Sequence, residues 1–271
     1  MTIFYTCRRY VLACLSLLLI LSHPVAAAES ALERILSSGE LRVAMSGDQQ
    51  PFNFSYGKKK TLVGLDVDLA KELARTMSVE LKIVQTPFSD LLGTLEKGDA
   101  DLAISGMTIT AERTSKVSFV GPYVLSGKSI LLTESANRKL DTPGNFNQPN
   151  LRLTALEGST SESLIANRLP AASLMAAKDY EAAIGLLLDG KADGMVADLP
   201  ILAYTKNRNG RAQFQLAMPP LTVEPMVIAL AKGSLQLENY LRSFLAVSEK
   251  TGTLQRLYAK WFEGGSGELY R

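Results

Sequence analysis

The sequence predicts an α/β protein built from two similar lobes. Short β-rich runs alternate with helical segments along the chain, and this alternation is typical of α/β proteins. A near-repeat relates the two halves, because residues 95–104 match residues 187–196 at an offset of 92 residues. Each copy holds a helix end, a glycine turn and an apolar strand opened by Ala-Asp. The alternative is that Gly-x-Ala-Asp before a strand is common turn chemistry.

Each half contains strands and helices in alternation. In the first half the predicted strands are residues 41–45, 81–84 and 101–105, and the predicted helices are residues 66–77 and 88–96. The first helix is marked by apolar residues at four-residue spacing from Leu65 to Met77. In the second half the predicted strands are residues 151–155 and 194–197, and helices begin at Ser159 and span residues 180–188.

The first 28 residues form a predicted export signal with cleavage after Ala28. Arg8 and Arg9 precede an 11-residue apolar run, and small residues follow it. A membrane-spanning helix needs about 20 apolar residues, so this run is too short to span. Cleavage would leave a mature chain of 243 residues, 271 less 28, outside the cytoplasm.

The composition of that mature chain excludes many kinds of chemistry. Every cysteine (Cys7, Cys14) and the single histidine (His23) lie in the predicted leader. Ser-His and Cys-His catalysis, structural disulfides and the common zinc sites are therefore excluded. The leader carries two arginines and no acid, so its loss takes the net charge from +2 to zero. This balance does not favour nucleic acid as a partner.

Ligand contacts are predicted beyond the carboxyl ends of the strands, where open α/β sheets bind their ligands. Residues 46–50 follow the first strand and residues 105–110 follow the third. Residues 158–161 and Asp198 hold the corresponding places in the second half. If the two lobes are equivalent, these four segments face one another.

Two charged residues and one helix start are candidates for binding. The planar guanidinium of Arg113 suits a carboxylate because it forms two parallel hydrogen bonds, although an arginine there can also be a solvated surface residue. Ser159 and Glu162 match a capping box, and a helix start with spare amides can also bind an anion. Asp198 directly follows an apolar strand, so it is either a site carboxylate or the N-cap of the next helix.

Six motifs occur in a characteristic order, at residues 64–70, 98–101, 106–113, 119–123, 158–160 and 252–262. Together they resemble the bacterial extracellular solute-binding proteins of family 3, the receptors of polar amino-acid ABC transporters. The resemblance runs from Leu36 to Phe262. It implies a two-lobed periplasmic binding protein of type II, in which each lobe is a mixed sheet flanked by helices and the ligand cleft lies at the hinge. With the near-repeat, it places lobe 1 at residues 29–126 and 225–271, and lobe 2 at residues 127–224.

The resemblance also implies a role for each matching residue. Arg113 would clamp the α-carboxylate of an amino acid with the help of Thr108 and Thr160. Asp198 would pair with the α-ammonium. The other implied ligand contacts are Ser105, Gly106, Ser161, Phe52 and Phe88. No catalytic residue, metal or cofactor is expected.

One segment departs from the family pattern. The family usually has an aromatic residue and a proline before its Pro-Phe pair, whereas this chain has Gln49 and Gln50 after Asp48. An aromatic lid is then missing, or is supplied by Phe52, Phe88 or Tyr123. Gln49 either binds a polar ligand side chain or is an exposed loop amide, and Asp48 beside it is a further candidate contact.

The expected function is capture of a polar amino acid or close relative in the periplasm, by a monomer that delivers it to an inner-membrane ABC permease. Cyclohexadienyl dehydratases are one alternative, because they resemble the same fold and share the opening seen here at residues 47–52. Those enzymes carry an acid and a lysine in the cleft, whereas Glu224 has no lysine beside it in the sequence. The other alternative is a sensory binding protein that presents its ligand to a receptor.

Overall fold

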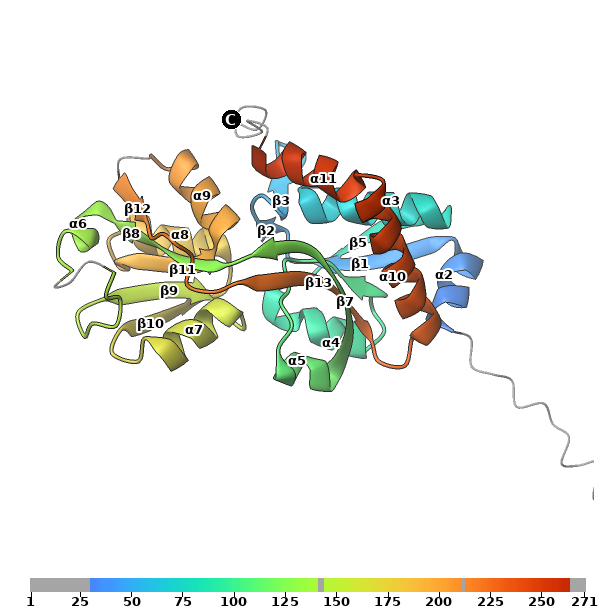
Figure 1. Ribbon diagram of the computed structural model, residues 1–271, viewed down its shortest axis with the longest axis horizontal. Coiled ribbons are helices and arrows are strands. Elements are labelled where there is room, and N and C mark those ends of the chain that lie inside the picture. The colour runs from blue at the N-terminus through green and yellow to red at the C-terminus, as the bar shows by residue number, and fades with distance from the viewer. Residues whose placement is uncertain (1–29, 141–143, 211–212, 264–271) are drawn as a thin grey trace, which may run out of the picture. The chain divides into compact units, whose positions relative to one another are not determined.

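Two five-stranded sheets organise the chain, as the computed structural model shows for residues 30–140, 144–210 and 213–263 (Figure 1). The first sheet contains β1 (Glu40–Met45), β5 (Glu80–Gln85), β6 (Leu102–Ala103), β7 (Val117–Ser126) and β13 (Glu224–Ala231). The second contains β8 (Lys128–Thr133), β9 (Arg152–Leu156), β10 (Ser173–Ala177), β11 (Gly194–Asp198) and β12 (Phe214–Leu216). The predicted leader lies outside the described residues.

The two sheets follow the same plan. Their strand orders are β5-β1-β6-β13-β7 and β10-β9-β11-β8-β12. In each sheet the first three strands are parallel, and the fourth and fifth are each antiparallel to the strand before. Each is thus a mixed sheet, and the predicted two-lobed α/β fold is confirmed.

The near-repeat corresponds to a contact that both sheets make. Asp101 accepts hydrogen bonds from the backbone nitrogen of Arg42 at 2.9 Å and from its guanidinium at 2.7 Å. Asp193 does the same with Arg152, at 2.9 and 2.8 Å. The aspartate of each Ala-Asp pair therefore binds the middle one of the three parallel strands in its own sheet, β1 or β9. This shared role goes beyond common turn chemistry.

Helices cover both sheets, and a small antiparallel sheet of β2 (Asp48–Gln49), β3 (Asn53–Tyr56) and β4 (Thr61–Val63) lies beside the first. The helices of the first half are α2 (Ala31–Ser38), α3 (Leu65–Met77), α4 (Leu91–Glu96) and α5 (Ala111–Lys116). The next are α6 (Glu134–Asn137), α7 (Thr160–Arg168), α8 (Tyr180–Leu188) and α9 (Leu199–Arg208). The last are α10 (Leu235–Lys250) and α11 (Thr253–Tyr258). None of the helices in these described segments is long and apolar enough to cross a membrane.

Most predicted elements are found within a residue or two, with two informative differences. The predicted helix at residues 88–96 begins as a 3₁₀ turn, Phe88–Asp90, before α4. The predicted strand at residues 101–105 is shortened to Leu102–Ala103. Ser105 and Gly106 leave the ladder because they enter a buried hydrogen-bond network.

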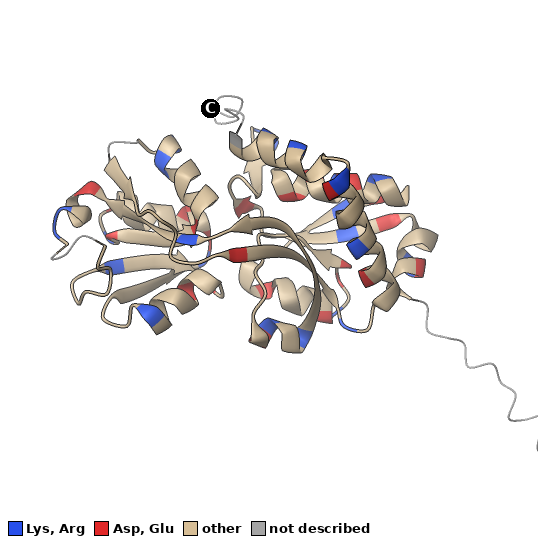
Figure 2. Cartoon of the chain, in the orientation of Figure 1, with Lys and Arg blue, Asp and Glu red and all other residues tan. Residues whose placement is uncertain are grey.

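The chain passes twice between the sheets, along strands that lie side by side (Figure 1). β7 leads through Gly127 into β8, and β13 returns antiparallel to β7, with Glu224 opposite Ser126. Gly127 lies where the crossings approach closely, since a Cβ there would be 2.2 Å from the Thr222 carbonyl oxygen. The exact lobe boundaries given above remain predictions. Figure 2 shows Lys and Arg interspersed with Asp and Glu over the helices of both sheets.

Candidate functional site

Asp198 faces a lysine at the end of its strand. It is the register partner of Lys128 in the antiparallel pair of β11 and β8, and the Lys128 ammonium donates to Asp198 Oδ2 at 2.6 Å. Asp198 occupies the N-cap position of α9, but its side chain makes no capping hydrogen bond there. Burial raises the pKa of Asp198, and Lys128 opposes that shift. The side chain therefore belongs to a buried ion pair.

Glu224 is the centre of a second set of contacts. Its Oε2 atom accepts from the hydroxyls of Thr108 at 2.9 Å and Thr160 at 2.8 Å, and lies 3.5 Å from the Lys128 ammonium. Oε1 accepts from Thr222 at 3.1 Å. Burial raises the pKa of Glu224, but Lys128 and the threonine hydroxyls outweigh burial, so the net shift is downward. Glu224 is therefore an ionised carboxylate at neutral pH.

Arg113 completes this group, which we call the charged cluster (Arg113, Lys128, Asp198 and Glu224). Its guanidinium donates to the carbonyl oxygen of Thr108 at 2.8 Å and to that of Gly158 at 2.9 Å. It also lies over the Phe88 ring, 5.4 Å from its centroid. Burial lowers the pKa of Arg113, while Glu224, Glu112 and Asp198 oppose the shift. Because an arginine has five N–H donors, others remain for a ligand.

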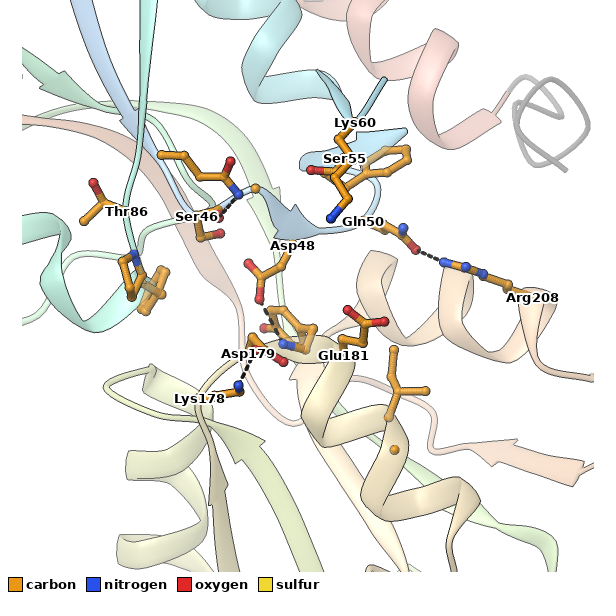
Figure 3. A pocket seen from close by; sticks show the side chains of 18 of the residues that line it. Ser46, Asp48, Gln50, Ser55, Lys60, Thr86, Lys178, Asp179, Glu181 and Arg208 are labelled. Carbon is orange, nitrogen blue, oxygen red and sulfur yellow. Dashed lines mark hydrogen bonds and ion pairs between the residues drawn. The ribbon is translucent and has the colours of Figure 1, made fainter. Parts of the chain in front are cut away.

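Phe88, whose ring lies against Arg113, also lines a cavity of about 850 Å³, which Figure 3 shows from close by. It is lined from the first-sheet side by residues that include Asp48, Thr86 and Phe88, and from the second-sheet side by Tyr180 and Glu181. Asp48 points toward the start of α8 and accepts from the backbone nitrogen of Tyr180 at 2.9 Å. Arg113 and Asp198 do not line this cavity. Phe88 and Tyr180 line the cavity and also lie beside the charged cluster. Phe88 contacts Arg113, and the pKa of Tyr180 is raised by burial and by nearby Asp198.

Three further predicted site residues, Gln49 in β2 and Ser105 and Gly106 after β6, lie in one buried hydrogen-bond network. The Gln49 amide donates to Ser105 Oγ at 3.4 Å, and Gly106 donates to the Asp66 carboxylate at 3.1 Å. Gln49 is only 2% exposed, so the interpretation as an exposed loop amide is wrong. Burial raises the pKa of Asp66 to about 6, against hydrogen bonds from Tyr123, Asn53 and Gly106. These hydrogen bonds hold Ser105 and Gly106, at the start of the 105–110 loop, against the core of the first half.

Phe52 does not line the cavity, and its side chain packs in the core. Its side chain is fully buried, with its ring centroid 5.5 Å from that of Phe262. Its carbonyl oxygen accepts from the backbone nitrogen of Asp66 at the start of α3. Tyr123 donates its hydroxyl to Asp66 at 2.8 Å and is likewise a support. Of the three candidate aromatic lids, Phe88 is the one that lines the cavity.

Four buried side-chain oxygens in the described part of the chain have no hydrogen-bond partner: Asp48 Oδ1, Ser126 Oγ, Ser161 Oγ and Asp198 Oδ1. Three of them belong to predicted site residues, and Ser126 lies beside Asp198. Buried polar atoms in folded proteins are almost always paired, so each exception requires an explanation. Among the described residues, no group of three or more His, Cys, Asp or Glu side chains is arranged to hold a metal ion.

The sequence pattern of the bacterial extracellular solute-binding proteins, family 3, matches residues 41–264. The chain belongs to this family. Among its relatives is the cyclohexadienyl dehydratase of Pseudomonas aeruginosa, 30% identical over 93% of this chain and 92% of the enzyme. The relatives of this chain therefore include an enzyme as well as binding proteins.

Solved structures of this family agree with the fold. An ancestral amino-acid-binding protein, described as a precursor of cyclohexadienyl dehydratase, has a TM-score of 0.80 and 34% identity, over 86% of this chain and 100% of that one. The substrate-binding protein of an amino-acid ABC transporter from Streptococcus pneumoniae, solved with L-arginine, has a TM-score of 0.76 and 29% identity. That match covers 84% of this chain and 95% of that one.

Sequence patterns do not single out two members of the charged cluster, Lys128 and Glu224. Lys128 opens an apolar strand, and Glu224 has no lysine beside it in the sequence. The structure supplies that lysine in space, 3.5 Å away. The sequence does contain one signal for Lys128. It is a charged residue at the start of an apolar strand, and a buried charge there requires a partner of opposite charge.

Proposed function

We propose that this chain captures a polar amino acid or close relative in the periplasm and delivers it to an inner-membrane ABC permease. The observation that supports this most is the pair of buried carboxylates, Asp48 at the cavity and Asp198 in the charged cluster, whose Oδ1 atoms bond at most a neighbouring serine hydroxyl. A buried carboxylate oxygen calls for a donor. A ligand ammonium or guanidinium is such a donor.

The opposite end of an amino acid is provided for by Arg113. Two of its N–H groups donate to carbonyl oxygens, and the remaining ones can receive a carboxylate in charge-assisted hydrogen bonds. Ser161 Oγ, buried and without a partner at the start of α7, is a further donor on the same side. An amino-acid zwitterion could bind Arg113 through its carboxylate and Asp198 through its ammonium.

The adjoining cavity is the proposed place for the ligand side chain. It carries Asp48 with its free oxygen, Phe88 and Tyr180. A polar or cationic side chain fits this lining better than an apolar one, because burying a carboxylate oxygen without a partner is costly. Affinity near micromolar, about −8 kcal/mol, is expected for a cleft that encloses its ligand.

The test is a calorimetric and thermal-shift screen of the exported protein against the twenty amino acids, opines and small amines. We expect saturable binding by one polar class, with a rise in the unfolding temperature because the ligand binds only the folded state. Failure of every amino acid and opine to bind would overturn the proposal.

A dehydratase is the second candidate, favoured by the Glu224–Lys128 contact and by the 30% identical enzyme. Loss of a hydroxyl as water needs a proton donor, and a good donor has a pKa near the working pH. The lowered pKa of Glu224 argues against it as that donor. Turnover of prephenate or arogenate by the same preparation would establish the enzyme and displace the binding proposal.

A further inference from the structure

The charged cluster contains its own carboxylate and its own ammonium. The Thr108 and Thr160 hydroxyls, expected from the sequence to receive the carboxylate of a ligand, both donate to Glu224 Oε2. The Asp198 carboxylate, expected to receive a ligand ammonium, already accepts from Lys128 at 2.6 Å. Lys128 and Glu224 thus make the contacts that the head group of an amino acid would make.

The backbone holds Glu224 in this position. Glu224 precedes Pro225, and a residue before proline is restricted to extended conformations. It also lies opposite Ser126 in the paired crossing strands. The side chain is buried, and both of its carboxylate oxygens accept hydrogen bonds. The arrangement is therefore built into the fold and is electrostatically satisfied.

Glu224 also joins the two lobes. Thr108 follows β6 of the first sheet and Thr160 begins α7 beside the second, and one oxygen of Glu224 bonds both. The hydrogen bond from Arg113 to the Gly158 carbonyl spans the same gap. These bonds stabilise contact between the lobes without a carboxylate from outside.

We propose that Glu224 is an internal competitor for the carboxylate of the ligand and thereby sets the affinity and specificity of this site. The inference rests on the proposed function. With Glu224 ionised, the cluster holds two positive and two negative side chains, so it has no excess charge to attract a carboxylate. A ligand carboxylate must displace Glu224 from Thr108 and Thr160, whereas an amine without a carboxylate has no such competitor.

The test uses Glu224→Gln, which keeps the size of the side chain, and Glu224→Ala, which removes its oxygens. Val223→Ala is the matched control, because Val223 is the neighbouring residue on the same crossing and is exposed. Each protein is titrated calorimetrically with L-arginine and with agmatine, which is arginine without its carboxylate. L-lysine and cadaverine form a second pair. Thermal unfolding checks that every variant is folded.

We expect Glu224→Gln to bind the amino acids about tenfold more tightly, because a neutral amide competes less strongly than a carboxylate for the threonine hydroxyls. The affinity for agmatine and cadaverine should change by less than about twofold, and Val223→Ala should match the wild type. Equal or weaker binding of the amino acids by both Glu224 variants, with the wild type binding, would overturn this inference alone. Binding of no amino acid by any of the proteins would overturn it together with the proposed function.

A scattering measurement covers the case in which the glutamine and alanine variants unfold. Glu224 already bonds both lobes without an outside carboxylate. We therefore expect the radius of gyration of wild-type protein at pH 7 to change little when saturating L-arginine is added. A clear decrease in the radius on adding L-arginine, in protein shown to bind it, would count against the competitor.

Discussion

Lys128 and Asp198 lie directly opposite each other in the antiparallel pair of β8 and β11, and their charged groups are 2.6 Å apart. Both side chains are almost fully buried. The strand register alone brings them together, because partners in register project from the same face of a sheet. The carboxylate expected to meet a ligand ammonium is thus tuned by a lysine of the protein itself.

Breaking this pair should destabilise the fold. Asp198→Asn and Lys128→Met should each lower the free energy of unfolding by about 3 kcal/mol, because each leaves a buried charge with less compensation. The double variant should lose less free energy of unfolding than the two single variants together, which corresponds to a coupling energy of about 2 kcal/mol. Urea denaturation of the four proteins measures this. The exposed pair Glu72 and Arg75, treated in the same way, should couple by less than about 0.5 kcal/mol.

Arg113→Lys should weaken ligand binding by about tenfold or more. A lysine ammonium cannot donate to the carbonyls of Thr108 and Gly158 and also offer a planar pair of bonds to a carboxylate. The measurement is a calorimetric titration with the tightest amino acid from the screen. Arg75→Lys, on the exposed face of α3, is the control and should leave affinity unchanged. Affinity within twofold of wild type in Arg113→Lys would contradict its role as the carboxylate clamp.

The stability of the fold should depend on pH through Asp66. Burial raises the pKa of Asp66 to about 6, above its value of about 3.9 in an unfolded chain. The folded state therefore binds this proton more tightly than the unfolded state does. The contribution is fully present below about pH 4 and is lost as pH rises through about 6.

Comparison with Asp66→Asn isolates this effect. The difference in unfolding free energy, wild type minus variant, should fall by about 2 kcal/mol between pH 4 and pH 7. Urea denaturation at each pH value measures it, and the exposed Asp90→Asn serves as the control. A difference that is flat with pH, or that rises, would show that the burial argument for Asp66 is wrong.

Gly64→Ala should destabilise the protein by at least about 2 kcal/mol. Gly64 has a φ angle of +136°, and a Cβ there would lie 2.0 Å from the Phe52 carbonyl oxygen. Gly185→Ala, in α8 where a Cβ would meet nothing within 4 Å, should be neutral or stabilising by about 0.5–1 kcal/mol. Thermal unfolding of both variants measures the contrast. Equal stability of the two would refute the close approach at Gly64.

The sequence by itself determined the local elements and the order of the site segments. Apolar spacing predicted α3 to within one residue, because a helix depends on neighbours within one turn. The near-repeat predicted two equivalent sheets, and the strand ends predicted that Thr108, Thr160 and Asp198 lie near one another. Each of these inferences needs only short-range pattern or strand polarity.

The tertiary structure alone decided which side chains complete the site. Lys128 meets Asp198 through strand register, and Glu224 meets Lys128 because two crossing strands run side by side. Phe52 belongs to the core and Gln49 is buried against Ser105. No short window of sequence contains these pairings, because each depends on how distant strands pack. The sequence therefore predicted the segments of the candidate site, and packing between remote strands determined which charged side chains complete it.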